Sequence, residues 1–202
     1  VGDDSYQKIK PYIRQALQGM TVSYEIELSD HSHHAKGGVL HTTLIPCDDI
    51  RNGYYGLSTD ISEIKALQAQ LEFEANHDAL TGLPNRRAFQ QSLIHAAGKQ
   101  EKADRDIALL FLDIDNFKAY NDTYGHEFGD LILKFFGYTL RENLRSQDIA
   151  ARLAGDEFTV LLSGLMNTES DVSRICISLM RALHSIECIA GVPVALSASI
   201  GV

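Results

Sequence analysis

Cysteine is scarce in this sequence, and its few cysteines are widely spaced. Of 202 residues only three are cysteine, at Cys47, Cys176 and Cys188. None has the close spacing of a metal-binding motif, and an odd number cannot all form disulfides. A reducing, cytoplasmic location is therefore expected. Cys176 and Cys188 stand among apolar residues, which favours packed thiols over reactive ones.

Basic residues and long apolar runs are also few. The chain has 18 Lys and Arg against 27 Asp and Glu, a formal net charge of −9, which argues against binding along nucleic-acid phosphates. No apolar run approaches the roughly 20 residues needed to cross a bilayer, so no membrane contact is expected of this segment. The chain does not begin with Met, which leaves open a membrane anchor upstream. Hydrophobic residues at 45% and charged residues at 22% are ordinary for a folded protein and exclude general disorder.

Residues 1–61 have the pattern of a small β-rich domain. Apolar and polar residues alternate over 22–28, as in a half-buried strand. Further strands are predicted at 39–45, where a proline follows, and at 54–60. A short helix ending near Gly19 precedes them. The segment is too small to enclose a large core, and it has the pattern of the end of a longer domain.

Residues 62–77 are predicted to form a linker helix. Ile64, Leu67 and Leu71 occupy heptad positions among Glu, Gln and Lys. Only about two heptads are present, so a plain connecting helix and a dimeric coiled coil both stay open.

The remainder, 78–202, alternates helices and strands. An apolar strand is predicted at 107–113, a hairpin at 150–162 and a strand at 192–202, with helices between them. This order predicts an α/β or α+β fold with one central sheet. Because the chain stops within the last strand, the domain is expected to be truncated at its C-terminal end.

Two acidic pairs stand at predicted strand ends. Asp113 and Asp115 are two residues apart and would share a face, while Asp156 and Glu157 lie at the tip of the hairpin. If the hairpin adjoins the Asp113 strand, up to four carboxylates converge, and oxygen ligands of this kind favour Mg²⁺ or Mn²⁺ in nucleotidyl transfer. The alternative is that these residues merely mark a strand end and a tight turn.

Two polar segments have less specific patterns. Between the acidic pairs, a turn leads into a helix where free backbone N–H groups and Lys118 can hold phosphate, and Asn121 and Asp130 can bind a nucleobase. The cluster of His31, His33 and His34 invites a metal site, but neighbouring histidines in a loop are more often solvated.

Five motifs in order resemble the GGDEF-domain diguanylate cyclase family. They are Asp78–Arg86 (DALTGLPNR), Asp113–Asp122 (DIDNFKAYND), Gly125–Asp130 (GHEFGD), Arg152–Phe158 (RLAGDEF) and Ser199–Val202 (SIGV). The run ending YYGLSTDISE, over 54–63, is similar to the closing motif of a PAS sensor domain.

The resemblance implies an α+β fold, with a palm-type central sheet flanked by helices as in adenylyl cyclases. It divides the chain into the C-terminal part of a PAS-like domain at 1–61, a linker helix at 62–77 and a GGDEF domain at 78–202. The implied activity joins two GTP into cyclic di-GMP with release of pyrophosphate. A homodimer is needed, because each subunit holds one GTP.

The resemblance also assigns the acidic residues. Asp113 and Asp156 match the Mg²⁺ (or Mn²⁺) ligands, with the Ile114 carbonyl assisting. Glu157 matches the residue that binds metal or takes the proton from the attacking 3′-OH. With Asp156 it forms the implied catalytic pair.

The remaining matches concern ligands and regulation. Asn121 and Asp130 match the guanine-binding residues, and Asn116, Phe117 and Lys118 the phosphate cradle. Arg145 and Asp148 match the inhibitory RxxD site that binds the product, although an exposed ion pair on a helix end explains RxxD alone equally well. Asp78 and Arg86 match an ion pair that fixes the linker helix to the domain.

Two departures keep a second hypothesis open. The first glycine of the family's motif is Ala154, which is harmless at negative φ and strained at positive φ. The chain also stops before the segment that carries further basic phosphate contacts in the family. The alternatives to an active cyclase are a degenerate domain that binds GTP or cyclic di-GMP, possibly beside a phosphodiesterase domain, and a fragment for sensing and dimerisation only.

Overall fold

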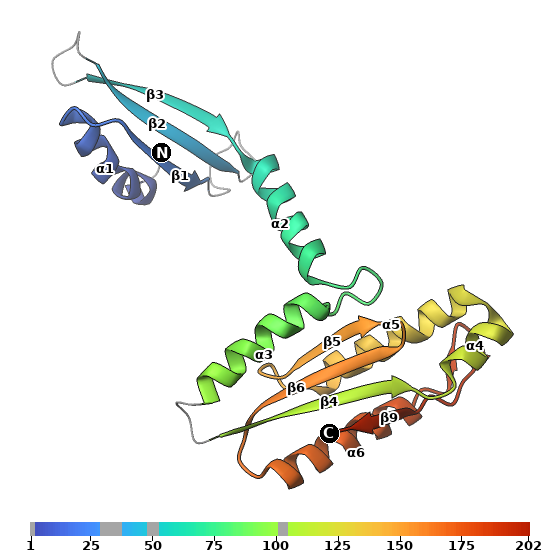
Figure 1. The fold of residues 1–202 in the computed structure, drawn as a ribbon. Coiled ribbons are helices and arrows are strands. Elements are labelled where there is room, and N and C mark those ends of the chain that lie inside the picture. Colours follow the sequence, from blue (N-terminus) through green and yellow to red (C-terminus); the bar gives the residue numbers. More distant parts are fainter. Residues whose placement is uncertain (1–2, 29–37, 48–52, 101–104) are drawn as a thin grey trace. The chain divides into compact units, whose positions relative to one another are not determined.

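The chain separates into two compact units, residues 1–72 and 73–202, which are described one at a time (Figure 1). The computed structural model describes residues 3–28, 38–47, 53–100 and 105–202. None of the helices formed by these residues has the length and apolarity that a bilayer crossing needs. The clustered histidines lie outside the described residues.

The first unit is a three-stranded antiparallel sheet with one helix packed against it. The strand order is β1 (Val22–Glu27), β2 (Val39–Cys47) and β3 (Gly53–Asp60). Helix α1 (Asp3–Leu17) contributes the buried Ala16. Strand β2 runs two residues further than the sequence predicted, because a proline keeps the extended backbone and gives up only one N–H donor.

Helix α2 (Ser62–Asn76) follows, and its first turn is capped by the Asp60 carboxylate, which accepts from the Ser62 backbone N–H at 2.9 Å. The helix has no buried residue among those described. Ile64, Leu67 and Leu71 are each 55% exposed. The heptad stripe is therefore uncovered.

The second unit is an α+β fold around a four-stranded antiparallel sheet in the order β5-β6-β4-β9, which confirms the predicted fold class. Its elements are α3 (Arg86–Gln100), β4 (Asp106–Ile114), α4 (Phe117–Tyr124), α5 (His126–Asn143), β5 (Ile149–Ala154), β6 (Glu157–Leu165), α6 (Thr168–His184), β7 (Cys188–Ile189), β8 (Val192–Pro193) and β9 (Ala198–Gly201).

The two faces of this sheet are covered unequally, as the alternation of β4 shows. Leu110, Leu112 and Ile114 are buried in the main core together with apolar residues of α5 and α6. Ile107 and Leu109, of opposite parity, pack in a smaller cluster with residues of α3 (Figure 1). Further along that second face the described residues cover the strand less, since Phe111 is 52% exposed. The C-terminal end of β4 is thus open on the α3 side.

The predicted strand at 192–202 is wrong in its extent. Residues 188–193 form a hairpin of β7 and β8 around Ala190 and Gly191, both at positive φ, whereas β9 alone pairs with β4. Between them the Ala195 backbone hydrogen-bonds to the Tyr120 hydroxyl at 3.2 Å instead of to a neighbouring strand. Cys188 lies on this surface hairpin and is exposed, contrary to the packed thiol expected.

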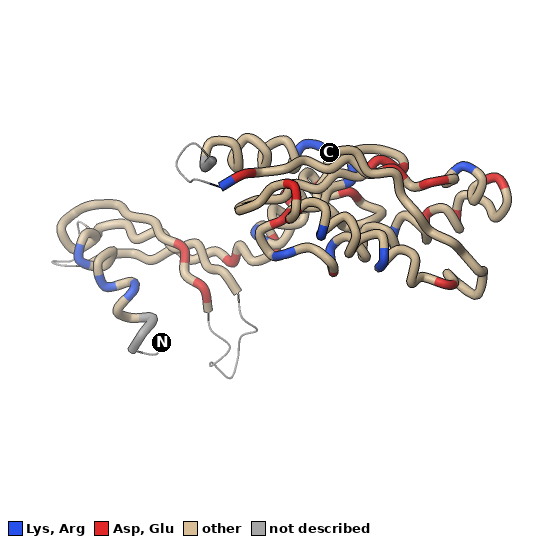
Figure 2. Tube along the Cα trace, turned by 90° about the horizontal axis from the view of Figure 1, so that it is seen from below, with Lys and Arg blue, Asp and Glu red and all other residues tan. Residues whose placement is uncertain are grey.

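Charged residues are mixed along the described chain. Figure 2 shows Lys and Arg at scattered positions with Asp and Glu between them.

Candidate active site

Strand pairing places three polar side chains in one row at the open end of β4. Asp113 is paired with Glu157 of β6 on one side and with Ser199 of β9 on the other. All three line a cavity of about 740 Å³, together with Arg86 and the exposed ring of Phe111. The cavity exists because α3 covers only the first half of this sheet face.

Negative charge is concentrated at Asp113. Partial burial raises the pKa of its carboxyl above the ordinary value, and the negative charges of Asp156 and Glu157 raise it further. A raised pKa means that the ionised form is disfavoured, as when like charges share a site. The hairpin therefore adjoins the Asp113 strand as predicted.

Asp115 contributes to the same concentration of charge, because its carboxylate also raises the pKa of Asp113. Strand β4 ends at Ile114, and the Asp115 carboxylate accepts hydrogen bonds from the Ser197 hydroxyl at 2.6 Å and the Ser199 hydroxyl at 2.8 Å. These bonds lower the pKa of Asp115. Its charge is therefore satisfied within the protein.

Whether this site suits a divalent cation can be judged from its carboxylates. Among the residues that the structure describes, no three His, Cys, Asp or Glu side chains are grouped as a ready metal cage. Asp113, Asp156 and Glu157 nevertheless supply the hard oxygen donors that Mg²⁺ and Mn²⁺ prefer. The mutual repulsion that raises the Asp113 pKa is what a bound cation relieves. The chemistry of these residues fits such a cation.

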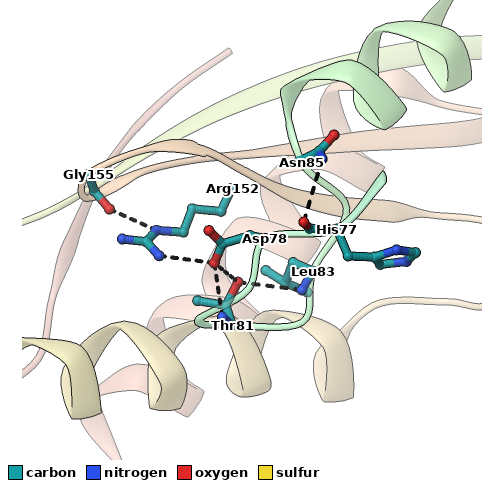
Figure 3. A network of polar contacts seen from close by, with 7 residues as sticks. All are labelled: His77, Asp78, Thr81, Leu83, Asn85, Arg152 and Gly155. Carbon is teal, nitrogen blue, oxygen red and sulfur yellow. Dashed lines mark hydrogen bonds and ion pairs between the residues drawn. The ribbon is translucent and has the colours of Figure 1, made fainter. Parts of the chain in front are cut away.

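A network of polar contacts links the β5–β6 hairpin to the turn at 78–84 (Figure 3). The Asp78 carboxylate accepts from the Arg152 guanidinium at 2.9 Å, and from the backbone N–H and the hydroxyl of Thr81 at 2.9 and 2.7 Å. Arg152 also donates through Nε to the Gly155 carbonyl at 2.9 Å. One side chain thus ties the hairpin tip to the 78–84 turn.

The predicted pair of Asp78 and Arg86 is wrong, because the partner of Asp78 is Arg152. Arg86 begins α3 and turns toward the cavity, where its Nη2 lies 4.0 Å from Glu157 Oε2. Both of these side chains are more than half exposed. Strand β5 is what brings Arg152 to Asp78 from 74 residues away.

The hairpin tip itself is unstrained at the alanine. Gly155 has φ +52°, whereas Ala154 is not among the residues with positive φ. Since alanine adopts negative φ freely, the substitution at the first motif position imposes no backbone penalty.

The turn after β4 leads directly into α4. Asn116 precedes the helix in the left-handed conformation, with φ 58°, and its carbonyl accepts from Ala119 at 2.9 Å. Among the described residues, the N–H groups of Phe117 and Lys118 in the first helical turn have no acceptor inside the protein, which is usual for a helix start. Lys118 is exposed beside them.

Asn121 and Asp130 are brought together by the α4–α5 corner. The Asn121 side chain lies against Gly129, the residue that precedes Asp130 in α5. Asp130 is exposed and Asn121 half-buried. The Asn121 side chain of α4 therefore lies against the residue that precedes Asp130 in α5.

Arg145 and Asp148 form a turn rather than an ion pair. The Asp148 carboxylate accepts from the backbone N–H groups of Arg145 and Ser163, both at 3.2 Å, and the ion pairs of the described residues do not join the two side chains. Arg145 instead lines a cleft of about 390 Å³, whose lining also includes His77 and Arg141.

Sequence reasoning missed the residues that support the site. Ser197 and Ser199 hold Asp115; Ser197 did not stand out in a segment of small residues, and Ser199 stood in a motif without a role. Arg152 offered a signal, because an arginine between Ala151 and Leu153 in a strand needs a partner when it is buried. Its side chain is only 11% exposed.

Comparison with known proteins identifies the family and the fold. A family model described as the diguanylate cyclase GGDEF domain matches residues 75–202, more than half of the chain. The chain belongs to this family. Its GGDEF domain is thus the second unit described above.

Three relatives illustrate the range of the family. The diguanylate cyclase DgcS of Shewanella oneidensis is 46% identical over 102 residues, 50% of this chain and 34% of DgcS. The cyclic di-GMP phosphodiesterase PdeR of Escherichia coli is 40% identical over 119 residues, 58% of this chain and 18% of PdeR. The structure of the coiled coil and GGDEF domain of DgcB from Caulobacter crescentus, in complex with c-di-GMP, has a TM-score of 0.63 and 27% identity, and covers 70% of this chain and 75% of that one. The chain thus spans about a third or less of these two curated relatives.

Proposed function

We propose that the GGDEF domain is a diguanylate cyclase that joins two GTP molecules into cyclic di-GMP. The observation that carries the proposal is the row of Glu157, Asp113 and Ser199 at the open end of the sheet, with Asp156 beside it. Carboxylates that repel one another at the mouth of a cavity are suited to a metal-assisted phosphoryl reaction.

Each half of the reaction is one nucleotidyl transfer. A bond forms between the 3′-oxygen of one GTP and the α-phosphorus of the other, and the bond from that phosphorus to pyrophosphate breaks. Glu157 takes the proton of the 3′-OH, for which an exposed carboxylate at the cavity is placed. A divalent cation held by Asp113 and Asp156, with the Ile114 carbonyl, would supply charge neutralisation at the phosphates.

Binding of the nucleotide is assigned to the corner of α4 and α5. The carboxylate of Asp130 accepts from N1–H and the amino group of guanine, a donor pair that adenine lacks, and Asn121 adds a second contact. The free N–H groups from Asn116 to Lys118, with the Lys118 ammonium, face the phosphates. Selection of GTP over ATP follows.

Dimerisation is assigned to helix α2. The exposed apolar stripe of Ile64, Leu67 and Leu71 supports the proposal that α2 pairs with the same helix of a second subunit. Apolar heptad positions are buried in such a coiled coil. Two subunits would then bring two GTP molecules face to face. We further propose that residues 1–61 belong to a PAS-like sensor, residues 62–77 to the linker and residues 78–202 to the GGDEF domain.

The proposed function is tested by incubating the chain with GTP and Mg²⁺ and separating the nucleotides by chromatography. Cyclic di-GMP with two pyrophosphates for each molecule supports the cyclase, and ATP in place of GTP is expected to give no product. Binding of GTP without product would support the alternative, a regulatory nucleotide-binding module. That alternative draws support from PdeR, since a relative with this domain is named a phosphodiesterase.

We also propose that cyclic di-GMP inhibits the enzyme through the cleft at Arg145. Two arginines, Arg141 and Arg145, are among the residues that line the cleft. A guanidinium pairs with phosphate and stacks on guanine, which suits a ligand that carries two of each. Product bound there would keep two active sites apart, so the inhibition is non-competitive with GTP.

Arg145→Ala is expected to weaken binding of cyclic di-GMP about tenfold or more, the scale of a lost charge-assisted hydrogen bond. The substitution leaves the turn intact, because Asp148 is bound by the backbone N–H of residue 145, which alanine retains. Titration calorimetry measures the affinity, and steady-state assays should show higher product accumulation. Arg181→Ala, an exposed arginine of α6, is the control. Equal affinity of wild type and Arg145→Ala for cyclic di-GMP would contradict the assignment of the product site to this cleft.

A further inference from the structure

Helices α4 and α5 meet at a corner made by a single residue. Gly125 ends one helix and begins the other with φ 85° and ψ 164°, a conformation that other residues rarely adopt. Its N–H donates to the Asn121 carbonyl at 2.9 Å. The rings of Tyr124 and Phe128 pack across the corner with centroids 5.0 Å apart. The two helices are therefore held in one arrangement.

At this corner the Asn121 amide occupies the space beside Gly129. A Cβ atom added to Gly129 would lie 1.9 Å from Asn121 Oδ1 and 2.9 Å from its Cγ. Atoms of folded proteins do not approach so closely, so the observed orientation of the Asn121 side chain requires glycine at position 129. By contrast, a Cβ on Gly98, also within a helix, meets nothing within 4 Å.

Packing, and not hydrogen bonding, sets this orientation. Within the part of the chain that the structure describes, the Asn121 amide has no hydrogen-bond partner. Its donors and acceptor are thus free for a ligand, and its neighbour in α5, Gly129, is followed in the chain by Asp130. The Asn121 amide can take this orientation because Gly129 has no side chain in the space that the amide fills.

We infer that Gly129 is a positioning residue for nucleobase recognition. It leaves the space that the Asn121 amide fills, next to the residue that precedes Asp130, and any larger residue would turn the amide away. Gly129 itself touches neither substrate nor reacting atoms. The inference rests on the proposed function for the identity of the ligand, but the steric dependence of Asn121 on Gly129 stands on the geometry alone.

The test is a double-mutant cycle in the full chain, with Gly129→Ala, Asn121→Ala and both together. In the wild-type background Gly129→Ala should bring little or no rise in the melting temperature, because the new methyl group must displace the Asn121 side chain. In the Asn121→Ala background the same change should raise it, because the obstacle is gone and alanine favours a helix over glycine. Gly98→Ala is the matched control and should raise the melting temperature equally in both backgrounds.

Nucleotide binding gives the second readout. Gly129→Ala should weaken binding of a non-hydrolysable GTP analogue roughly tenfold, raise KM with little change in kcat and narrow the preference for GTP over ATP. In the Asn121→Ala background it should have no further effect.

Each outcome decides the inference. An equal shift in melting temperature in both backgrounds, or unchanged GTP affinity in Gly129→Ala, would overturn it. A third outcome is that the melting-temperature shift differs between the two backgrounds but no variant, wild type included, binds GTP. That result would contradict the proposed function and the ligand assigned to Asn121, but it would support the steric control by Gly129.

Discussion

Asp113→Asn is expected to abolish metal-dependent turnover of GTP, lowering kcat by a factor on the order of 10³ or more. The amide keeps the shape of the side chain but removes the charge that would hold a divalent cation between β4 and the hairpin. The production of cyclic di-GMP at several Mg²⁺ concentrations measures the effect.

The fold of the variant is expected to survive, because Asp113 is exposed and repelled by Asp156 and Glu157. Without divalent cations, removing one of these like charges should leave the melting temperature equal to or above that of wild type. Added Mg²⁺ should stabilise wild type more than the variant. Asp122→Asn, an exposed carboxylate of α4, is the control and should retain activity. Normal turnover by Asp113→Asn at ordinary Mg²⁺ concentration would refute the metal assignment.

Arg152→Ala is expected to lower the free energy of unfolding by about 3 kcal/mol, as for the loss of charge-assisted hydrogen bonds to a partly buried partner. The Arg152 and Asp78 side chains are only 11% and 25% exposed. The change leaves Asp78 without its cation and the Gly155 carbonyl without its donor. Denaturant titration measures the loss.

The matched control is Arg174→Ala, which removes an arginine–aspartate pair of nearly the same length, 3.0 Å, from the surface of α6. Because Arg174 is 63% exposed, its loss should cost less than about 1 kcal/mol. Arg152→Lys should fall between the two, since an ammonium lacks the fork that reaches both acceptors. Equal effects of the two alanine variants would contradict the role given to the network.

The effect of Arg152→Ala should also depend on pH. Burial by itself raises the pKa of Asp78, but hydrogen bonds from Thr81 and Arg152 outweigh it, so that the pKa lies below the ordinary value of 3.8. A lowered pKa in the folded state adds stability above the ordinary pKa, and this is lost as the pH falls through the folded-state value. The difference between wild type and Arg152→Ala should therefore be largest at neutral pH and narrow below pH 3.8.

Much of the second unit follows from local sequence pattern. Strand β4 and helix α5 show a periodic pattern of buried residues, and strand β6 after Gly155 is a continuous apolar run. Such patterns involve residues that are close in sequence, so they can be recognised from the sequence alone. The placement of Asp113 beside Glu157 also followed once the hairpin was taken as the neighbour of β4.

The tertiary structure alone decided which distant residues meet. Asp78 was assigned to Arg86, eight residues away, but strand pairing brings Arg152 to it and leaves Arg86 at the cavity. Asp115 shares sequence parity with Asp113, and its carboxylate is held by the hydroxyl groups of Ser197, just before β9, and Ser199, within it. Such partners depend on strand order and register, which no short-range pattern encodes.

Close approach was equally invisible in the sequence. Gly129 reads as one more glycine in a helix, and only the packing of α4 on α5 shows that a neighbouring amide fills the place of its side chain. The sequence by itself determined the family, the central strands and the residues that can carry the chemistry. The tertiary structure decided how those residues are held, because hydrogen bonds and steric contacts between distant segments exist only after the sheet has formed.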